Sequence, residues 1–270
     1  MLVVAATPIG NLADHSPRLV DTLQAADLIV AEDTRTTRSL INKLDIDVSA
    51  DIRPLHEHNE TAVIDSVLTA AARGMVVLVS DAGMPGISDP GYPLVAEAHR
   101  RGITVSVVPG PNAVIAALAA SGLPTDRFCF EGFVPKKGRT AWLQDLAGER
   151  RTMVFFESPH RLHDSLADMA QVFGPDRQAS VCRELTKKFE QVSTGSLEDL
   201  VDEFSGDVKG EVTVVVRGTS GPVVSFDQAL ALVASKISGG HKATEATREV
   251  ARETGHSKPD LYRAWLERGA

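Results

Sequence analysis

The sequence has 270 residues, of which 43% are hydrophobic and 24% are charged, and its formal net charge at pH 7 is −8. This length predicts one or two domains, and the composition is typical of a folded globular protein rather than a disordered one. The acidic balance disfavours binding to naked nucleic acid through charge alone, and 5% aromatic residues leave little material for base stacking.

The apolar runs of the sequence, such as Met75–Val79 and Ala113–Ala120, are too short to span a bilayer. The first residues lack the basic segment that begins a signal peptide. Cys129 and Cys182 lie in apolar runs, which indicates buried thiols in a reducing compartment, with neither a disulfide nor a Cys-based zinc site. We therefore expect a cytoplasmic protein without membrane attachment.

Short Val-rich runs alternate with amphipathic stretches through residues 1–120, the first expected domain. Continuous apolar runs are typical of buried parallel strands, here Leu2–Ala6, Leu28–Ala31, Met75–Val79 and Thr104–Val108. Helical patterns fall between them at Arg18–Ala26, Thr36–Leu44, Ala62–Arg73 and Leu94–Arg101. The alternation predicts an open α/β sheet that binds its ligands at the carboxyl ends of the strands.

A second α/β domain, with a more mixed sheet, is expected over residues 121–220, after a boundary at Ala120–Thr125. Its predicted strands are Phe128–Phe130, Thr152–Phe156, Ala179–Cys182, Phe189–Thr194 and Val212–Val216. Its predicted helices are Thr140–Ala147, Arg161–Phe173 and Leu197–Phe204.

Residues 224–270 follow a Gly/Ser/Pro linker at Gly218–Pro222 and are expected to be entirely helical. The predicted helices are Phe226–Lys236, Thr244–Thr254 and Lys258–Leu266. The stretch Ala243–Leu266 has the spacing of a helix-turn-helix, and a plain helical cap on the second domain explains it equally well.

The loop Ser80–Gly91 directly follows a predicted strand and is the richest motif. Glycines and prolines alternate with polar residues in it, so backbone amides can approach a ligand. Asp81 and Asp89 could bind hydroxyl or amino groups, and a structural turn with Asp caps is the plainer alternative.

Two other loops should meet this one at the same sheet edge. Ala6–Leu12 occupies the place of a dinucleotide phosphate loop but has only one glycine, which disfavours dinucleotide binding. Pro109–Ala113 opens an Ala-rich helix, with Asn112 as the expected N-cap. Convergence of three loops predicts a ligand site at this edge.

Two clusters of charged residues lie between the predicted strands of the first domain. Glu32–Arg38 is either a site cluster or a capped helix start, and its position at a strand end favours a site. His56–Glu60 could suggest a metal site, but no second cluster of ligands accompanies it, so a polar loop ending in a helix cap is the better interpretation. We expect no metal.

Seven segments form an ordered set along the chain: Ala6–Leu12, Glu32–Arg35, Ser80–Gly91, Pro109–Pro111, Ser121–Pro124, Phe155–Arg161 and Arg183–Lys187. In this order they resemble the ribosomal RNA small subunit methyltransferase I family, within the tetrapyrrole-methylase-like superfamily of S-adenosylmethionine enzymes. The resemblance covers nearly the whole chain and weakens after about Val223.

The resemblance implies S-adenosylmethionine in a cleft between two α/β domains, and a small helix-turn-helix-like extension at the carboxyl end. Matched motif by motif, the cofactor-binding residues would be Thr7, Pro8, Asp81, Gly83, Met84, Asn112, Ala113, Phe156, Glu157 and Thr213. The corrin enzymes of the superfamily carry a Gly-rich first loop where this chain has Thr7-Pro8-Ile9, which favours the RNA branch.

The resemblance also implies 2′-O-methylation of a cytidine in 16S ribosomal RNA, within the small ribosomal subunit, by a homodimer. A hydroxyl is a weak acid, so a carboxylate or imidazole is expected to take its proton. Loop position nominates Glu32, Asp33 and His58 for this role, with Arg35 holding a phosphate or orienting the acid.

Three alternatives stay open: methylation of a tetrapyrrole or other small molecule, methylation of a modified histidine on a protein, and a nucleic-acid-binding regulator built on Ala243–Leu266. The basic loop Lys136–Arg139 speaks against the first, and the lack of a dense Arg/Lys helix face against the last. The basic clusters Arg35–Arg38, Lys136–Arg151 and Lys187–Lys188 would face one cleft and recognise a shaped target rather than free RNA.

Overall fold

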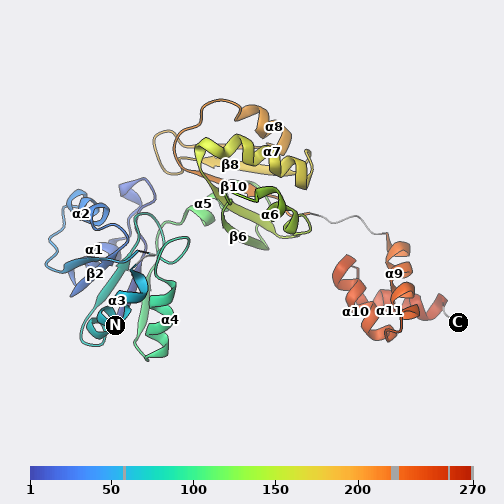
Figure 1. The fold of residues 1–270 in the computed structure, drawn as a ribbon, viewed down its shortest axis with the longest axis horizontal. Coiled ribbons are helices and arrows are strands. Elements are labelled where there is room, and N and C mark those ends of the chain that lie inside the picture. Colours follow the sequence, from blue (N-terminus) through green and yellow to red (C-terminus); the bar gives the residue numbers. More distant parts are fainter. Residues whose placement is uncertain (57–58, 220–224, 255, 269–270) are drawn as a thin grey trace. The chain divides into compact units, whose positions relative to one another are not determined.

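The structure, a computed structural model, describes residues 1–56, 59–219, 225–254 and 256–268. The chain forms two compact units (Figure 1). The first comprises Met1–Leu146 and Arg151–Arg217, and the second comprises Ala147–Arg150 and Gly218–Ala270. None of the described helices is both long enough and apolar enough to cross a membrane.

The first sheet of the first unit has the order β3-β2-β4-β1-β5, with all neighbouring strands parallel. Its strands are β1 (Leu2–Ala5), β2 (Leu28–Ala31), β3 (Asp51–Pro54), β4 (Val76–Val79) and β5 (Val105–Val108). Strand β1 lies between β4 and β5. The chain leaves β1 toward β2 on one side of the sheet and leaves β4 toward β5 on the other, so the strand order reverses between β4 and β1. Open α/β sheets bind ligands at such a switch point, outside the carboxyl ends of the strands.

Helices cover both faces of this sheet: α1 (Pro17–Gln24), α2 (Thr34–Lys43), α3 (Glu60–Ala71) and α4 (Tyr92–Arg100). On one face, Leu68 of α3 and Leu94 of α4 pack with Val4 and Leu78. On the other, Leu19 of α1 and Ile41 of α2 contribute to the core. Burial on both faces explains why strands β1, β2 and β4 read as continuous apolar runs.

The predicted strands and helices of residues 1–120 are confirmed within about two residues at each end, and the parallel arrangement is confirmed as well. Strand β3 was not predicted. It lies at the sheet edge, and its four residues are exposed or half-buried, so it lacks the apolar run that marks the others. Pro54 suits an edge strand because proline cannot donate to a second neighbour.

The second sheet has the order β6-β7-β10-β8-β9 and is mixed, as predicted. Only the pair β6–β7 is parallel. Its strands are β6 (Phe128–Phe133), β7 (Thr152–Glu157), β8 (Gln178–Arg183), β9 (Gln191–Ser196) and β10 (Val212–Val216). The sequence placed β9 two residues too early, because Phe189 looks like a core residue but is 65% exposed.

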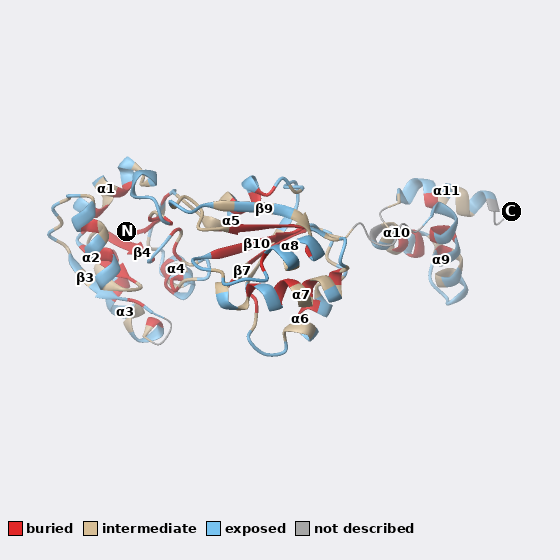
Figure 2. Cartoon of the chain, turned by 90° about the horizontal axis from the view of Figure 1, so that it is seen from above, coloured by how far each residue is buried: buried red, intermediate tan, exposed pale blue. Residues whose placement is uncertain are grey.

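Helix α5 (Ala113–Ala120) packs on one face of the second sheet, where Ala117 contacts the core around Val154 and Val215. Helices α6 (Arg139–Asp145), α7 (Leu162–Phe173) and α8 (Leu197–Glu203) lie over the other face (Figures 1 and 2). Strand β10 in the middle is buried along its whole length. Neither Cys129 nor Cys182 forms a disulfide. Cys182 is buried, but Cys129 in edge strand β6 is only half-buried, which corrects the prediction that both are buried.

The second unit contains α9 (Phe226–Ser238), α10 (Ala243–Thr254) and α11 (Lys258–Arg268). All three predicted helices are present. Leu230 and Val233 of α9 pack with Val250 of α10 and Leu261 of α11, so these helices form a hydrophobic core of their own. The linker Gly218–Pro222 lies mostly outside the described residues.

Candidate active site

The loops that leave the first sheet at its carboxyl edge form most of the candidate site. They follow β1, β2, β4 and β5, as the sequence predicted. Two cavities open at this edge within the first unit, and they share no lining residue. We call them the polar cavity and the apolar cavity.

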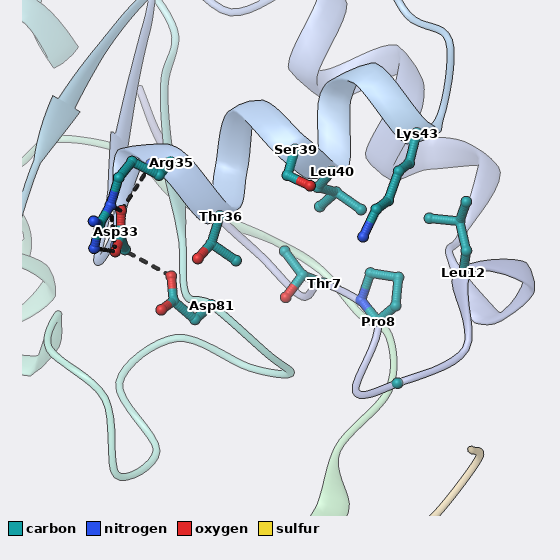
Figure 3. A pocket seen from close by; sticks show the side chains of 11 residues that line it. Thr7, Pro8, Leu12, Asp33, Arg35, Thr36, Ser39, Leu40, Lys43 and Asp81 are labelled. Carbon is teal, nitrogen blue, oxygen red and sulfur yellow. Dashed lines mark hydrogen bonds and ion pairs between the residues drawn. The ribbon is translucent and has the colours of Figure 1, made fainter. Parts of the chain in front are cut away.

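The polar cavity has a volume of about 600 Å³ and lies between α2 and the loops after β1 and β4. Figure 3 shows Asp33 and Arg35 at one end, Lys43 near the other, and Thr36 and Thr7 between them. Its full lining is Thr7, Pro8, Gly10, Leu12, Asp33, Arg35, Thr36, Ser39, Leu40, Lys43 and Asp81.

The apolar cavity has a volume of about 420 Å³ and is lined from both sheets of the first unit. The first sheet contributes Ile9 and the loops after β4 and β5; the second contributes Phe133 and the ends of β7 and β10. Phe133 and Phe156 pack edge to face at 5.3 Å between ring centroids and form an aromatic wall. A cavity of this size and apolar character is typical of a small-molecule site.

The structure divides the predicted cofactor residues between the two cavities. Seven line the apolar cavity: Gly83, Met84, Asn112, Ala113, Phe156, Glu157 and Thr213. Three line the polar cavity instead: Thr7, Pro8 and Asp81. Of the predicted catalytic residues, Asp33 and Arg35 line the polar cavity, Glu32 lines neither, and His58 lies outside the described residues.

Thr7 is buried and fastens one loop to another. Its N–H donates to the carbonyl of Gly83 at 2.9 Å and its carbonyl accepts from Gly83 at 3.2 Å, while its hydroxyl donates to the carbonyl of Ser80 at 3.3 Å. Thr7 therefore holds the start of the Ser80–Gly91 loop in place.

Asp33 is the N-cap of α2, as the plainer interpretation of its cluster predicted, and it also forms an ion pair. It accepts from the N–H of Arg35 at 2.8 Å and pairs with the Arg35 guanidinium at 2.6 Å. These hydrogen bonds from Arg35 lower the pKa of Asp33 to about 2. A carboxylate with so low a pKa is a weak base.

Asp81 and Glu32 join the ends of β2 and β4 by hydrogen bonds. The Asp81 carboxylate accepts from the N–H of Asp33 at 3.1 Å, and the Glu32 carboxylate accepts from the N–H of Asp81 at 3.4 Å. Burial raises the pKa of Asp81, and the hydrogen bond from Asp33 opposes that shift. These two hydrogen bonds connect the carboxyl end of β2 to the carboxyl end of β4.

Asp89 lines the apolar cavity. It was not predicted from the sequence to be a catalytic residue. Burial raises its pKa to about 6, and the negative charge of Glu32 adds to the shift, whereas a hydrogen bond from Ser80 opposes it. Among the described residues, no basic side chain forms an ion pair with Asp89. Its position after a strand was visible in the sequence, but its depth in the cavity was not.

Glu157 also lines the apolar cavity, but its carboxylate is fully buried and fully engaged. It pairs with Arg161 at 2.5 Å and accepts hydrogen bonds from the Ser165 hydroxyl and, at 2.6 Å, from the N–H of Ser158. These contacts lie within the second half of the unit. They make Glu157 a structural carboxylate at the cavity wall.

Lys187 was expected on an exposed basic surface, and the structure corrects this. Its ammonium pairs with Glu184 at 2.7 Å and with Glu211 at 3.1 Å. Its stem lies against Gly10, where an added Cβ would come within 2.5 Å of it. The side chain therefore closes the space between the β1 loop and the start of β10.

The chain matches a known family model and named relatives. The model described as tetrapyrrole (corrin/porphyrin) methylases matches residues 1–201. The ribosomal RNA small subunit methyltransferase I of Mycobacterium tuberculosis is 46% identical over 98% of this chain and 94% of its own. The protein of that name from Halalkalibacterium halodurans is 42% identical over 97% and 93%. This chain belongs to the ribosomal RNA small subunit methyltransferase I family, within the tetrapyrrole methylases.

Solved structures agree on the fold. A diphthine synthase superposes with a TM-score of 0.62 at 16% identity, covering 80% of this chain and 90% of its own. The uroporphyrin-III-C-methyltransferase of Thermus thermophilus superposes with a TM-score of 0.56 at 18% identity, covering 80% and 93%. The predicted fold class, two α/β parts of the tetrapyrrole-methylase type with helices at the carboxyl end, is confirmed.

Methyltransferases of this family use S-adenosylmethionine, and the apolar cavity fits that cofactor. Phe133 and Phe156 line this cavity, and aromatic rings attract both a nucleobase and a cation. Gly83 and Gly210 in the cavity wall adopt left-handed conformations, with φ of 84° and 91°, which glycine adopts without strain.

Proposed function

We propose that this protein transfers a methyl group from S-adenosylmethionine to the ribose 2′-hydroxyl of a cytidine in 16S ribosomal RNA. The observation that carries the proposal is the identity of 46% with a named ribosomal RNA small subunit methyltransferase I over 98% of the chain. That identity extends beyond the 201 residues of the general methylase model and includes the carboxyl-terminal helices.

The two cavities support a division between methyl donor and acceptor. In this proposal the apolar cavity binds S-adenosylmethionine through Met84, Asn112, Phe156 and Thr213, among others. The cofactor supplies a methyl group on a positively charged sulfur, which is intrinsically reactive toward an oxygen nucleophile. The walls of the cavity, above all Phe133 and Phe156, exclude water from this group.

The polar cavity would receive the ribose and phosphate of the acceptor nucleotide. Lys43 forms no hydrogen bond or ion pair through its ammonium with any part of the chain that the structure describes, and its side chain lines this cavity (Figure 3). A free ammonium suits a phosphate oxygen. Arg35 lines the opposite end and retains an exposed guanidinium face, with 87% of its side chain accessible.

The acceptor is proposed to be the assembled small subunit in the cytoplasm, bound by a homodimer. A net charge of −8 gives little general attraction to RNA, so a shaped target must provide the contacts. Local cations such as Lys43 would then act at short range.

The deciding experiment incubates the purified full chain and tritiated S-adenosylmethionine with small subunits from a strain that lacks this modification. We expect label in 16S RNA, and mass spectrometry of nuclease fragments should place it on the 2′-oxygen of one cytidine. Protein-free 16S RNA, with the same sequence, is the matched substrate control and should be labelled much more slowly. Subunits that stay unlabelled, or label on a base instead of a ribose, would reject the proposal.

The cofactor position has its own test, which uses one variant from each cavity. Calorimetry with Met84→Ala should weaken S-adenosylmethionine binding about fivefold or more, because it removes a wall of the apolar cavity. Pro8→Gly in the polar cavity should leave the affinity within twofold. The opposite pattern would place the cofactor in the polar cavity.

A further inference from the structure

The methyl acceptor must lose a proton during the reaction, and the structure separates the carboxylates that could take it. Such a group must lie where the acceptor oxygen meets the bound methyl donor. Glu32 and Asp33 were the candidates at strand ends, yet neither lines the apolar cavity. The ionised Asp33 carboxylate is moreover held in an ion pair with the Arg35 guanidinium.

Asp89 differs from Glu32 and Asp33 because it lines the cavity proposed for the methyl donor. It lines the apolar cavity, and its carboxylate lies close enough to Asp81, which lines the polar cavity, for the two charges to interact. Asp89 thus lines the cavity proposed for the methyl donor and interacts electrostatically with a residue of the cavity proposed for the acceptor. The apolar cavity has two other carboxylates. Glu157 is held by Arg161 and Ser165, and Glu211 pairs with Lys187 at 3.1 Å.

The loop that carries Asp89 is held rigidly at both ends. Thr7 fastens its start to the β1 loop, and the buried Glu60 carboxylate accepts from the N–H of Gly91 at 2.7 Å at its end. Ser88, next to Asp89, adopts a left-handed conformation with φ of 66°. Such backbone strain in a non-glycine residue is concentrated at functional sites, where surrounding structure enforces it.

We propose that Asp89 is the catalytic base that accepts the proton of the acceptor hydroxyl; this inference rests on the proposed function. As the oxygen forms its new bond to the methyl carbon, the O–H bond breaks and the proton moves to a carboxylate oxygen of Asp89. The electron pair of the broken carbon–sulfur bond stays on sulfur, which becomes a neutral thioether. Asp89 then releases the proton to water.

The neighbours of Asp89 tune it for this role. Burial and the charges of Glu32 and Asp81 hold its pKa near 6, while the Ser80 hydroxyl stabilises its ionised form. A base works best when its pKa lies just below the working pH, because it is then ionised yet still basic. At neutral pH Asp89 is ionised and can return its proton to solvent after each turnover.

The first test compares Asp89→Asn with the wild type in single turnovers at saturating S-adenosylmethionine and subunits. We expect the rate to fall at least about 100-fold, in the range for loss of a general base. Calorimetry should show S-adenosylmethionine affinity within threefold of the wild type. Asp21→Asn, an exposed acid on α1 that lines neither cavity, is the matched control and should retain full rate.

The second test follows the pH dependence, which a merely structural role would not move. The wild-type rate should fall as the pH drops through about 6, because protonated Asp89 cannot accept a proton. Glu32→Gln removes a negative neighbour and should move this inflection to lower pH. Ser80→Ala removes a hydrogen bond to the carboxylate and should move it to higher pH. Carbon-detected NMR of the ligand-free protein should show the same titration, absent in Asp89→Asn.

The outcomes separate the two proposals. A wild-type protein that labels no ribosomal RNA refutes the proposed function. A wild type that labels RNA, with Asp89→Asn within threefold of its rate or with the inflection near pH 6 retained, overturns the role of Asp89 alone. Weakened cofactor binding with an unchanged single-turnover rate would make Asp89 a sulfonium-binding residue instead.

Discussion

Asp89 and Glu157 are two of the three carboxylates that line the apolar cavity, and the charges around them differ. Asp89 comes from the first half of the unit and Glu157 from the second. Glu157 is completely buried and pairs with a cation, Arg161, that is itself only 23% exposed. Asp89 has acidic neighbours and a single hydroxyl for support. Burial with a cation fixes a charge in place, whereas burial without one leaves the group ready to take up a proton. The first arrangement serves the fold, and the second serves proton transfer.

The largest effect expected from this contrast is on stability. Glu157→Gln should lower the free energy of unfolding by about 3–5 kcal/mol, because it leaves Arg161 partly buried without a counter-charge. Urea denaturation followed by Trp142, whose ring lies 5.9 Å from that of Phe155, measures this half of the unit. The background carries Trp265→Phe, so that Trp142 alone reports.

The double variant Glu157→Gln with Arg161→Met is the matched control for that experiment. Removing both charges should recover part of the lost stability, since an apolar side chain leaves no unpaired charge behind. If Glu157→Gln alone changes the free energy of unfolding by less than about 1 kcal/mol, the buried pair is not structural and the contrast with Asp89 fails.

Asp89→Asn should act in the opposite direction, and more weakly. A pKa raised from 3.8 to about 6 means that the folded protein binds this proton more tightly than the unfolded chain. Stability therefore falls as the pH rises between about 4 and 6, and the variant avoids that loss. The side chain is only partly buried, so solvent screens the effect. We therefore expect the variant to gain about 1 kcal/mol in free energy of unfolding at pH 7.5, or about 2–4 °C in melting temperature.

Calorimetric melting of Asp89→Asn between pH 4 and 8 checks this sign. The gain should be complete above pH 7 and should shrink as the pH falls toward 4, where Asp89 is protonated in the folded protein and about half ionised in the unfolded chain. Asp21→Asn, exposed on α1, should show no gain at any pH. A variant that melts below the wild type at pH 7.5 would show that the Asp89 charge stabilises the fold, as the Glu157 charge does.

The sequence predicted much of this arrangement, for identifiable reasons. Val76–Val79 and Val212–Val216 are buried on both faces, so their apolar runs marked them as strands. Chain order then placed the loops after β1, β2, β4 and β5 at one edge. Asp51–Pro54 escaped because an exposed edge strand needs no apolar run.

The division of residues between the two cavities could not be predicted, because it depends on side-chain packing. Thr7 turns inward to hold Gly83, and Lys187 turns to Glu184 and Glu211, although both lie in motifs that suggest ligand contact. Asp33 and Asp89 both follow strands and look alike in sequence. Only the position of Arg35 beside one, and the burial of the other, gives them opposite pKa shifts.

Asp33→Asn gives the smallest expected effect and tests the third kind of carboxylate, one that is paired but exposed. Asparagine is also a good N-cap, so α2 should keep its start. The pKa of Asp33 is about 2, so it stays ionised across an assay from pH 5 to 8 and cannot produce an inflection near pH 6. We expect a single-turnover rate within about threefold of the wild type and an unchanged inflection. A loss of 100-fold would instead restore Asp33 as the base and reduce Asp89 to a neighbour that tunes it.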